Sequence, residues 1–267
     1  MEFLSRILEA KRLEVEKRSA RRPIADLERL AREMSKPRDF LGQLRGPGLG
    51  VIAEIKRASP SRGPLRPQLD APALAREYSA GGCMAISVLT DSAHFGARPD
   101  DLPSVRAAVS VPVLKKDFHL SEYQIWEARA EGADALLLIA AALDQPTLAG
   151  LIAIALRLGI CPLVEVHTAS EVGVALDCGA PVIGINNRDL ASFRVDLETT
   201  RRLRPLIPDG IPVVAESGIR SPEDARRVGQ WGADAVLVGE ALVCGDDPRG
   251  MVRSMSAGIP SLGRECG

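Results

Sequence analysis

Charged side chains stand where apolar segments of this sequence end, beginning with VIAEIKRASPSRG at residues 51–63. Residues two apart on a strand point to the same face, so Glu54 and Lys56 share the face of Ile52. Burying a carboxylate and an ammonium group is costly unless the two are paired or used in a reaction. This pair therefore marks a candidate catalytic site.

Similar polar groups follow later apolar runs. They are Lys115 and Lys116 in VPVLKK, Glu165 in CPLVEV, Asn186, Asn187 and Arg188 in VIGINNR, and Glu216 and Ser217 in IPVVAES. Carboxylates and ammonium groups packed in a partly dry site suit general acid–base catalysis. A Schiff base at Lys116 is the alternative that the residues leave open. The histidines at 94, 119 and 167 are scattered, so we expect no metal site.

A repeat of helix, glycine and strand must position these groups. Four segments share it: SAGGCMAISVLT, AEGADALLLIA, DCGAPVIGINN and QWGADAVLVGE. Glycine ends a helix in the left-handed conformation, and the apolar run after it is typical of a strand buried on both faces. With VIAEI, VPVLKK, CPLVEV and IPVVAES, the pattern predicts strands near residues 51, 84, 112, 135, 161, 182, 212 and 234. Helices are expected between them, as at residues 221–230, where Ser221 suits the N-cap and Pro222 the first turn.

Eight strand–helix units predict an α/β fold, the (β/α)8 TIM barrel. A doubly wound open sheet is the alternative, although no GxGxxG sequence follows the first strand. We expect one domain over residues 1–267, in which residues 1–48 form an N-terminal helical extension that covers the barrel. A second helix is expected over residues 23–34. The apolar side of the first helix comprises Leu4, Ile7, Leu8 and Val15.

The composition limits the classes of partner. A net charge of -1 and a pI of about 6.4 give no electrostatic reason to expect nucleic acid or an anionic membrane. No apolar run reaches the roughly 18 residues of a membrane span, and the N-terminal sequence has no signal-peptide pattern. The cysteines form no CxxC pair, so we expect them to be reduced and mostly buried, in a cytoplasmic protein. They are Cys83, Cys161, Cys178, Cys244 and Cys266.

Two glycines suggest how an anion would bind. Gly218 follows the seventh predicted strand and Gly239 the eighth, each just before a helix. Backbone N–H groups at these positions form the usual phosphate site of such barrels. Either glycine alone would indicate only a tight turn. Together they predict a phosphorylated small-molecule substrate.

The sequence resembles the indole-3-glycerol phosphate synthase family of tryptophan biosynthesis over essentially its whole length. The resemblance rests on IAEIKRASPSRG, LKKDFHLSEYQIWEARAEGADALLLI, LVEVH, IGINNRDL and AESGI, in that order. It implies a lyase that needs no cofactor and no metal. The substrate implied is 1-(2-carboxyphenylamino)-1-deoxy-D-ribulose 5-phosphate, which loses carbon dioxide and water as its ring closes to indole-3-glycerol phosphate.

The resemblance also implies roles for individual residues. Lys116 matches the general acid that protonates the ketone, and Glu165 matches the base, with Glu54 as its partner. Lys56 matches a lysine near the substrate carboxylate, a second candidate acid for the dehydration, and Asn186 belongs to the same catalytic set. Matched substrate contacts are Ser59 and the backbone of Gly218, Gly239 and Glu240 at the phosphate, Phe95 and Phe118 at the aromatic ring, and Arg188, Glu216, Ser217 and Leu237.

Two segments depart from the family pattern. The loop after the second strand has Ala97 and Arg98 where the family more often has Gly-Ser, which leaves the details of that loop open. Leu-Val-Cys after the eighth strand replaces a common Leu-Met-Arg. Neither change touches the acid–base set.

We expect a monomer, or at most a weak homodimer.

Two other functions are compatible with the fold. A sugar-phosphate isomerase, such as phosphoribosyl anthranilate isomerase, would share the phosphate site but not the lysines of strands 1 and 3. A non-catalytic barrel that binds a phosphorylated ligand would not need the whole acid–base set.

Because strand side chains alternate, only one of Lys115 and Lys116 can face the barrel mouth. The resemblance assigns Lys116, which leaves Lys115 facing the surrounding helices or solvent.

Overall fold

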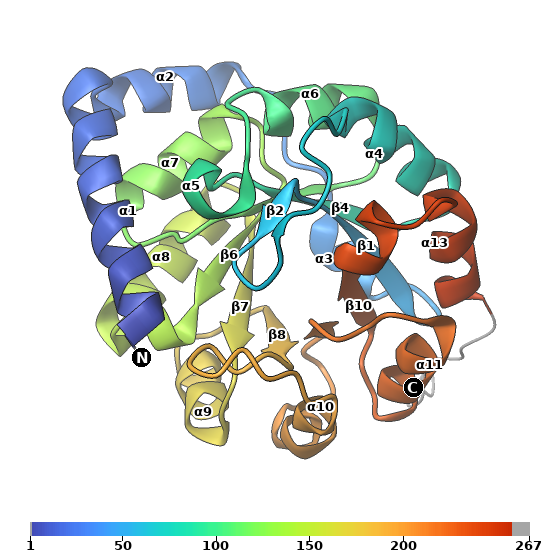
Figure 1. Cartoon of the computed structure of the whole chain (residues 1–267). Coiled ribbons are helices and arrows are strands. Elements are labelled where there is room, and N and C mark those ends of the chain that lie inside the picture. Colours follow the sequence, from blue (N-terminus) through green and yellow to red (C-terminus); the bar gives the residue numbers. More distant parts are fainter. Residues whose placement is uncertain (1, 258–267) are drawn as a thin grey trace.

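A closed barrel of eight parallel strands forms the centre of the computed structural model, which describes residues 2–257 (Figure 1). The strands are β1 (Gly50–Ile55), β4 (Ala85–Leu89), β5 (Val113–Lys116), β6 (Ala135–Ile139), β7 (Cys161–Val166), β8 (Val182–Asn186), β9 (Val213–Glu216) and β10 (Ala235–Val238). Each strand pairs with the next, and β10 pairs with β1 to close the barrel. All eight lie where the sequence predicts them. The barrel is confirmed, and the open-sheet alternative is wrong.

Helices surround the strands (Figure 1). They are α4 (Ala71–Ala80), α5 (Ser92–Phe95), α6 (Asp101–Ala108), α7 (Glu122–Ala130), α8 (Gln145–Arg157), α9 (Ala169–Asp177), α10 (Glu198–Leu203), α11 (Pro222–Gln230), α12 (Glu240–Val243) and α13 (Pro248–Ser256), with 3-10 turns at Ala140–Ala142 and Arg204–Leu206. The start of α11 follows the sequence signal, because Ser221 and Asp224 form a capping box. A short unpredicted hairpin, β2 (Ala58–Ser59) and β3 (Gly63–Pro64), follows β1.

Apolar side chains fill the barrel from inside. Alternate strand residues such as Ile52, Leu114 and Leu163 pack together in the interior, while their neighbours along each strand pack against the helices. Helix α3 (Phe40–Leu44) closes the amino-terminal end of the barrel, since Phe40 and Leu44 are both 1% exposed and belong to the interior cluster. The packed interior leaves the carboxyl ends of the strands as the place for a site.

Two helices precede α3 in the sequence. They are α1 (Glu2–Arg21) and α2 (Ile24–Glu33), and α2 lies within the predicted range of residues 23–34. On α1, Ile7, Leu8 and Val15 are buried as expected, and Leu4 is half-buried. Both α1 and α2 pack against α7. No helix within the described residues is long and apolar enough to cross a membrane.

The cysteines differ from expectation in their burial. Cys83 is buried, Cys161 and Cys178 are half-buried, and Cys244 is exposed. All four are free thiols, as predicted. The expectation that most are buried is wrong for these four, because the ends of strands and helices leave Cys161, Cys178 and Cys244 accessible. Cys266 lies outside the described residues.

Candidate active site

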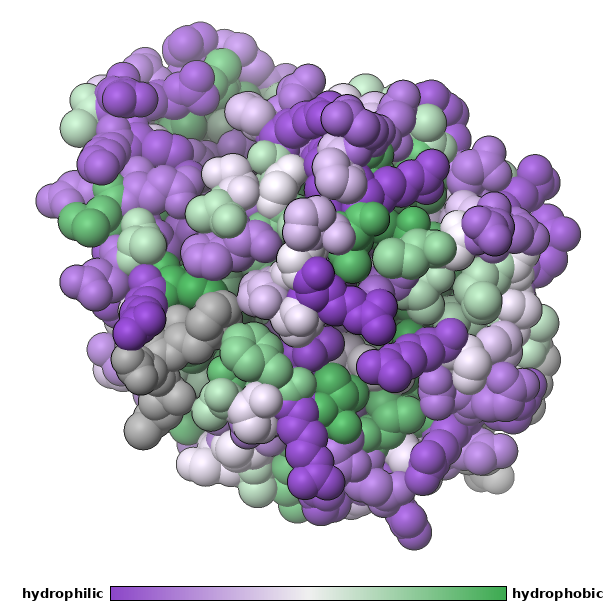
Figure 2. Space-filling model, viewed as in Figure 1, coloured by the Kyte–Doolittle hydropathy of each residue, from purple (hydrophilic) through white to green (hydrophobic). Residues whose placement is uncertain are grey.

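A cavity of about 190 Å³ opens at the carboxyl ends of the strands. Figure 2 shows strongly hydrophilic residues next to hydrophobic ones on this face of the molecule. Every residue that the sequence assigned to the site lines the cavity except Glu216, which is buried behind it. Those that line it are Glu54, Lys56, Ser59, Phe95, Lys116, Phe118, Glu165, Asn186, Arg188, Ser217, Gly218, Leu237, Gly239 and Glu240.

A chain of alternating charges crosses the floor of the cavity from β1 through β5 to β9. Lys56 Nζ lies 2.6 Å from Glu54 Oε1, and the other oxygen of Glu54 lies 3.4 Å from Lys116 Nζ. Lys116 Nζ in turn lies 2.7 Å from Glu216 Oε2. The pair Glu54 and Lys56 is therefore part of a larger network, in which Lys116 stands between two carboxylates.

The network shifts the protonation equilibria of its members. Burial by itself would lower the pKa of Lys116, but Glu216 and Glu54 outweigh burial and raise that pKa. Burial would raise the pKa of Glu54, but Lys56 and Lys116 lower it below its usual value. Glu216 is the exception, because full burial and the nearby charge of Glu165 raise its pKa despite Lys116. Lys116 is thus a cation, and Glu216 is the carboxyl group that protonates most readily.

Glu165 on β7 has a partner that sequence reasoning missed. His167 Nε2 lies 3.3 Å from Glu165 Oε1, while its Nδ1 lies 3.2 Å from Glu171 Oε2. Burial would lower the pKa of His167, but these two carboxylates raise it to about 10. Burial would raise the pKa of Glu165, but its contact with His167 and the charge of Lys116 lower it to about 2. Glu165 is therefore held as a carboxylate beside an imidazolium ion.

Two glycines make room for these carboxylates. A Cβ atom at Gly239 would come within 3.0 Å of the Glu54 carboxylate and of Lys56 Nζ. A Cβ atom at Gly184 on β8 would come within 3.0 Å of Glu216 Oε1. Real Cβ atoms essentially never come so close, so a larger residue at either position would displace a charged side chain. Gly184 was not predicted to matter.

The cavity end bordered by β9, β10 and β1 carries groups that suit an anion. Ser59 is buried, and its Oγ has no hydrogen-bond partner among the described residues. Ser217 and Gly218 have left-handed backbone conformations, with φ of 62° and 85°. Gly239 stands at the N-terminus of α12. A phosphate accepted here would satisfy the Ser59 hydroxyl and the backbone N–H groups together.

The opposite end, bordered by β4, β5 and β6, is mainly apolar, although Asp91 and Asp117 of the same loops also line the cavity. Phe95, Phe118 and Leu137 line it, together with Leu4 and Ile7 of α1. The sequence predicted that α1 would cover the barrel, and the structure shows that its side chains form part of the cavity wall. An elongated ligand with an aromatic ring at one end and a phosphate at the other fits this division.

Two further strand-end residues have other roles: Lys115 faces away from the cavity, and Asn187 supports a loop at its rim. Lys115 is buried, and its Nζ lies 2.6 Å from Glu131 Oε2 of the segment after α7. It therefore faces the helices, and the alternative that it faces solvent is wrong. Asn187 holds the β8 loop by donating to the Ser217 carbonyl and accepting from Thr200.

Comparison with known proteins places this arrangement in one family. The model of the family described as indole-3-glycerol phosphate synthase matches residues 4–255. A protein of that name from Streptomyces griseus is 48% identical over 257 residues, covering 96% of both chains. One from Mycobacteroides abscessus is 50% identical over 252 residues, covering 94% of this chain and 93% of the relative.

A solved structure supports the fold independently. Thiamine phosphate pyrophosphorylase from Pyrococcus furiosus aligns with a TM-score of 0.60 at 21% identity, covering 81% of this chain and 96% of the other. At that identity the likeness concerns the fold alone. The family model and the relatives span nearly all of the described chain, and so this protein belongs to the indole-3-glycerol phosphate synthase family.

Proposed function

We propose that this chain converts 1-(2-carboxyphenylamino)-1-deoxy-D-ribulose 5-phosphate into indole-3-glycerol phosphate, carbon dioxide and water, a step of tryptophan biosynthesis. The observation that carries the proposal is the position of Lys116, a half-buried ammonium group between Glu54 and Glu216 on the cavity floor. The apolar end of the cavity suits the phenyl ring of the substrate. The end at Ser59 and Gly239 suits its phosphate.

In the proposed reaction Lys116 is the general acid. The aromatic carbon that bears the carboxylate attacks the ketone carbon, and the carbonyl oxygen takes a proton from the Lys116 ammonium group to become a hydroxyl. The carboxylate then leaves as carbon dioxide, and its bonding electrons restore the aromatic ring. A donor placed this way contributes typically about 10²–10⁴-fold to the rate.

The dehydration needs a second acid and a base. The hydroxyl leaves as water after protonation, for which Lys56 at the cavity surface is the candidate acid. A proton is then lost from the substrate to a carboxylate. Glu165 lines the cavity and is ionised at neutral pH, which makes it the candidate to accept that proton, and its pairing with His167 makes it a weaker base than an ordinary carboxylate. Asn186, which also lines the cavity, contacts Glu165 and so fixes its orientation.

The remaining assignments concern substrate contacts and the state of the protein. We assign Arg188, Ser217 and Leu237 to contacts along the substrate, while Glu216 acts through Lys116. We also propose that the protein acts in the cytoplasm, as its free cysteines suggest, and that it is a monomer or a weak homodimer. Light scattering during size-exclusion chromatography tests the oligomeric state.

The test of the function follows product fluorescence. Purified protein is mixed with the carboxyphenylamino substrate, and appearance of the indole chromophore is recorded without added metal or cofactor. The expected result is turnover. Absence of indole fluorescence from a folded protein would contradict the proposal. A sugar-phosphate isomerase would instead consume a substrate without forming an indole, and it gives no role to the chain of Lys56, Glu54 and Lys116.

A further inference from the structure

A lysine of the N-terminal helix is buried where α1 meets the barrel mouth. The side chain of Lys11 is 1% exposed, and lysine is almost never fully buried unless it is paired. Its Nζ lies 2.7 Å from Asp91 Oδ2, 2.9 Å from Asp117 Oδ1 and 2.9 Å from Glu14 Oε2. Asp91 follows β4 and Asp117 follows β5, so one ammonium group joins α1 to two neighbouring loops.

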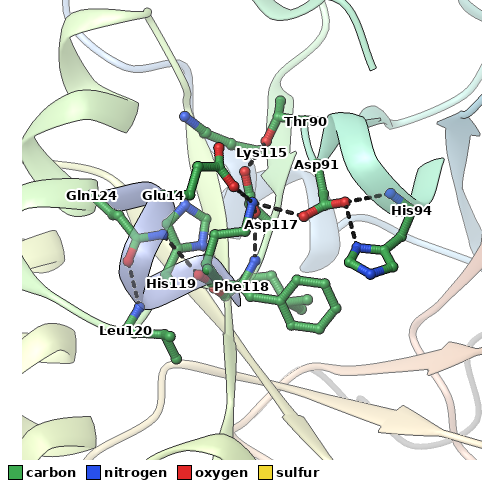
Figure 3. Close-up of polar contacts among 12 residues, drawn as sticks. Glu14, Thr90, Asp91, His94, Lys115, Asp117, Phe118, His119, Leu120 and Gln124 are labelled. Carbon is green, nitrogen blue, oxygen red and sulfur yellow. Dashed lines mark hydrogen bonds and ion pairs between the residues drawn. The ribbon is translucent and has the colours of Figure 1, made fainter. Parts of the chain in front are cut away.

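The two aspartates shape the loops that contain them (Figure 3). Asp91 caps α5 by accepting a hydrogen bond from the backbone N–H of His94 at 2.8 Å. Asp117 accepts one from the backbone N–H of Phe118 at 2.8 Å and one from Thr90 Oγ1 at 2.7 Å. The Lys11 ammonium group therefore pairs with the two carboxylates whose hydrogen bonds hold these loops in their conformations.

These loops supply the apolar end of the cavity. Phe95 is the last residue of α5, and Phe118 is hydrogen-bonded to the aspartate of the β5 loop. Lys116, the proposed acid, immediately precedes that aspartate. Leu4 and Ile7 of α1 line the same cavity and lie seven and four residues before the buried lysine, on the same face of the helix. Lys11 and the cavity-lining residues Leu4 and Ile7 thus lie on one face of α1.

The charge balance explains why this lysine matters more than a surface ion pair. Burial by itself would lower the pKa of Lys11, but Asp117 and Asp91 raise it above the usual value. Without the ammonium group two buried carboxylates would face each other, and buried charges without a partner separate or take up protons. Either response would alter the spacing of the two loops.

We propose that Lys11 is a positioning residue that fixes the distance between the loop of Phe95 and the loop of Phe118, and thereby sets the affinity of the cavity for the aromatic part of the substrate. The proposal rests on the proposed function, since it assigns the aromatic part to this end. It assigns no phosphate contact to these two loops, since the phosphate end is formed by Ser59 of β2 and by the residues that follow β9 and β10.

The experiment compares Lys11→Met with Lys17→Met in the full-length chain. Lys17 lies on the same helix but is exposed, so its replacement is the matched control. Dissociation constants of 2-aminobenzoate and of inorganic phosphate are measured by ligand-detected NMR, alongside KM and kcat. For Lys11→Met the dissociation constant of 2-aminobenzoate and the KM should rise about tenfold, the change expected when an aromatic contact worth about 1.4 kcal/mol is lost. Phosphate affinity should change much less, because the backbone N–H groups that follow β9 and β10 contact neither loop.

The outcomes separate positioning from general stability. Unchanged binding of 2-aminobenzoate to a Lys11→Met protein of reduced melting temperature would overturn the proposal, as would equal weakening of both probes. If Lys11→Met does not fold, Lys11→Gln keeps a donor of similar reach and is measured with the same expectations. If that variant does not fold either, the lysine acts on folding and the proposal is wrong. Turnover by the wild type tests the function separately, because probe binding does not depend on it.

Discussion

Replacing Lys115 and Lys116 one at a time by Met should separate stability from catalysis in two adjacent residues. Lys116 faces the cavity and lies between Glu54 and Glu216, whereas Lys115 faces outward to Glu131. We expect Lys116→Met to lower turnover by about 10²–10⁴-fold, the usual contribution of a general acid. The variant should still fold, because Glu216 already protonates readily and can take up a proton in place of the lost ion pair.

The expected cost of Lys115→Met is in stability. Its side chain is 4% exposed, so removing the ammonium group leaves Glu131 without its partner 2.6 Å away and leaves buried Glu127, 3.8 Å away, with Arg18 alone. Glu131 is 33% exposed and can be hydrated, so we expect a loss of about 1–3 kcal/mol rather than the larger cost of a fully buried charge. That corresponds to roughly 2–4 °C in Tm for each kcal/mol. Turnover should stay within a few-fold of wild type.

Steady-state kinetics and urea unfolding of both variants measure these effects. Borohydride added with substrate should trap no adduct at Lys116, since the proposed role requires no Schiff base. The reasoning would be refuted by turnover lost equally in both variants, by a stable and inactive Lys115→Met, or by a trapped adduct. Binding of a substrate analogue to Lys116→Met shows that the site is still formed.

Three further predictions follow from the site. Gly239→Ala should lower kcat by about 10²-fold, because the added methyl displaces the ion pair of β1; Gly150→Ala, where an added Cβ meets open space, is the control and should be unaffected. Ser59→Ala should weaken phosphate inhibition by about 0.5–1.5 kcal/mol, or up to about 3 if the charge of the acceptor matters; an unchanged inhibition constant would show that the hydroxyl does not contact phosphate. His167→Gln should reduce the free energy of unfolding by about 1–3 kcal/mol. Folding raises the pKa of His167 from 6.5 to about 10, so its contribution to stability is complete below pH 6.5 and is lost as the pH rises to about 10. Folding lowers the pKa of Glu165 from 4.5 to about 2, so its contribution is complete above pH 4.5 and is lost as the pH falls toward 2. The difference from wild type should therefore be greatest between pH 4.5 and 6.5, and a pH-independent difference in urea unfolding would contradict this ion pair.

The sequence was sufficient for the barrel and for most of the cavity lining. Continuous apolar runs after helix-ending glycines located four barrel strands, and four further apolar runs located the others, because strands covered on both faces have no polar alternation. The polar residues at strand ends then had to meet, since all strands of such a barrel point the same way. The α3 plug was not predicted, because its five residues are too few to show a helical period.

Other features depend on which side chains meet across the fold. His167 stands two residues after Glu165, so strand alternation could have suggested a shared face, as it did for the first strand. The need for glycine at Gly184 is not readable from sequence, because the colliding carboxylate of Glu216 lies on the neighbouring strand. Burial of Lys115 likewise depends on the docking of α7, which no local pattern specifies.

The closed amino-terminal end of the barrel determines how molecules reach and leave the site. With α3 and the apolar interior filling that end, the proposed substrate and all of its products share the opening at the strand carboxyl ends. Carbon dioxide is small enough to diffuse out past a bound intermediate, whereas the phosphorylated product must vacate the opening before the next substrate enters. Product and substrate therefore exclude one another from the cavity, so product inhibition should be competitive with respect to the substrate.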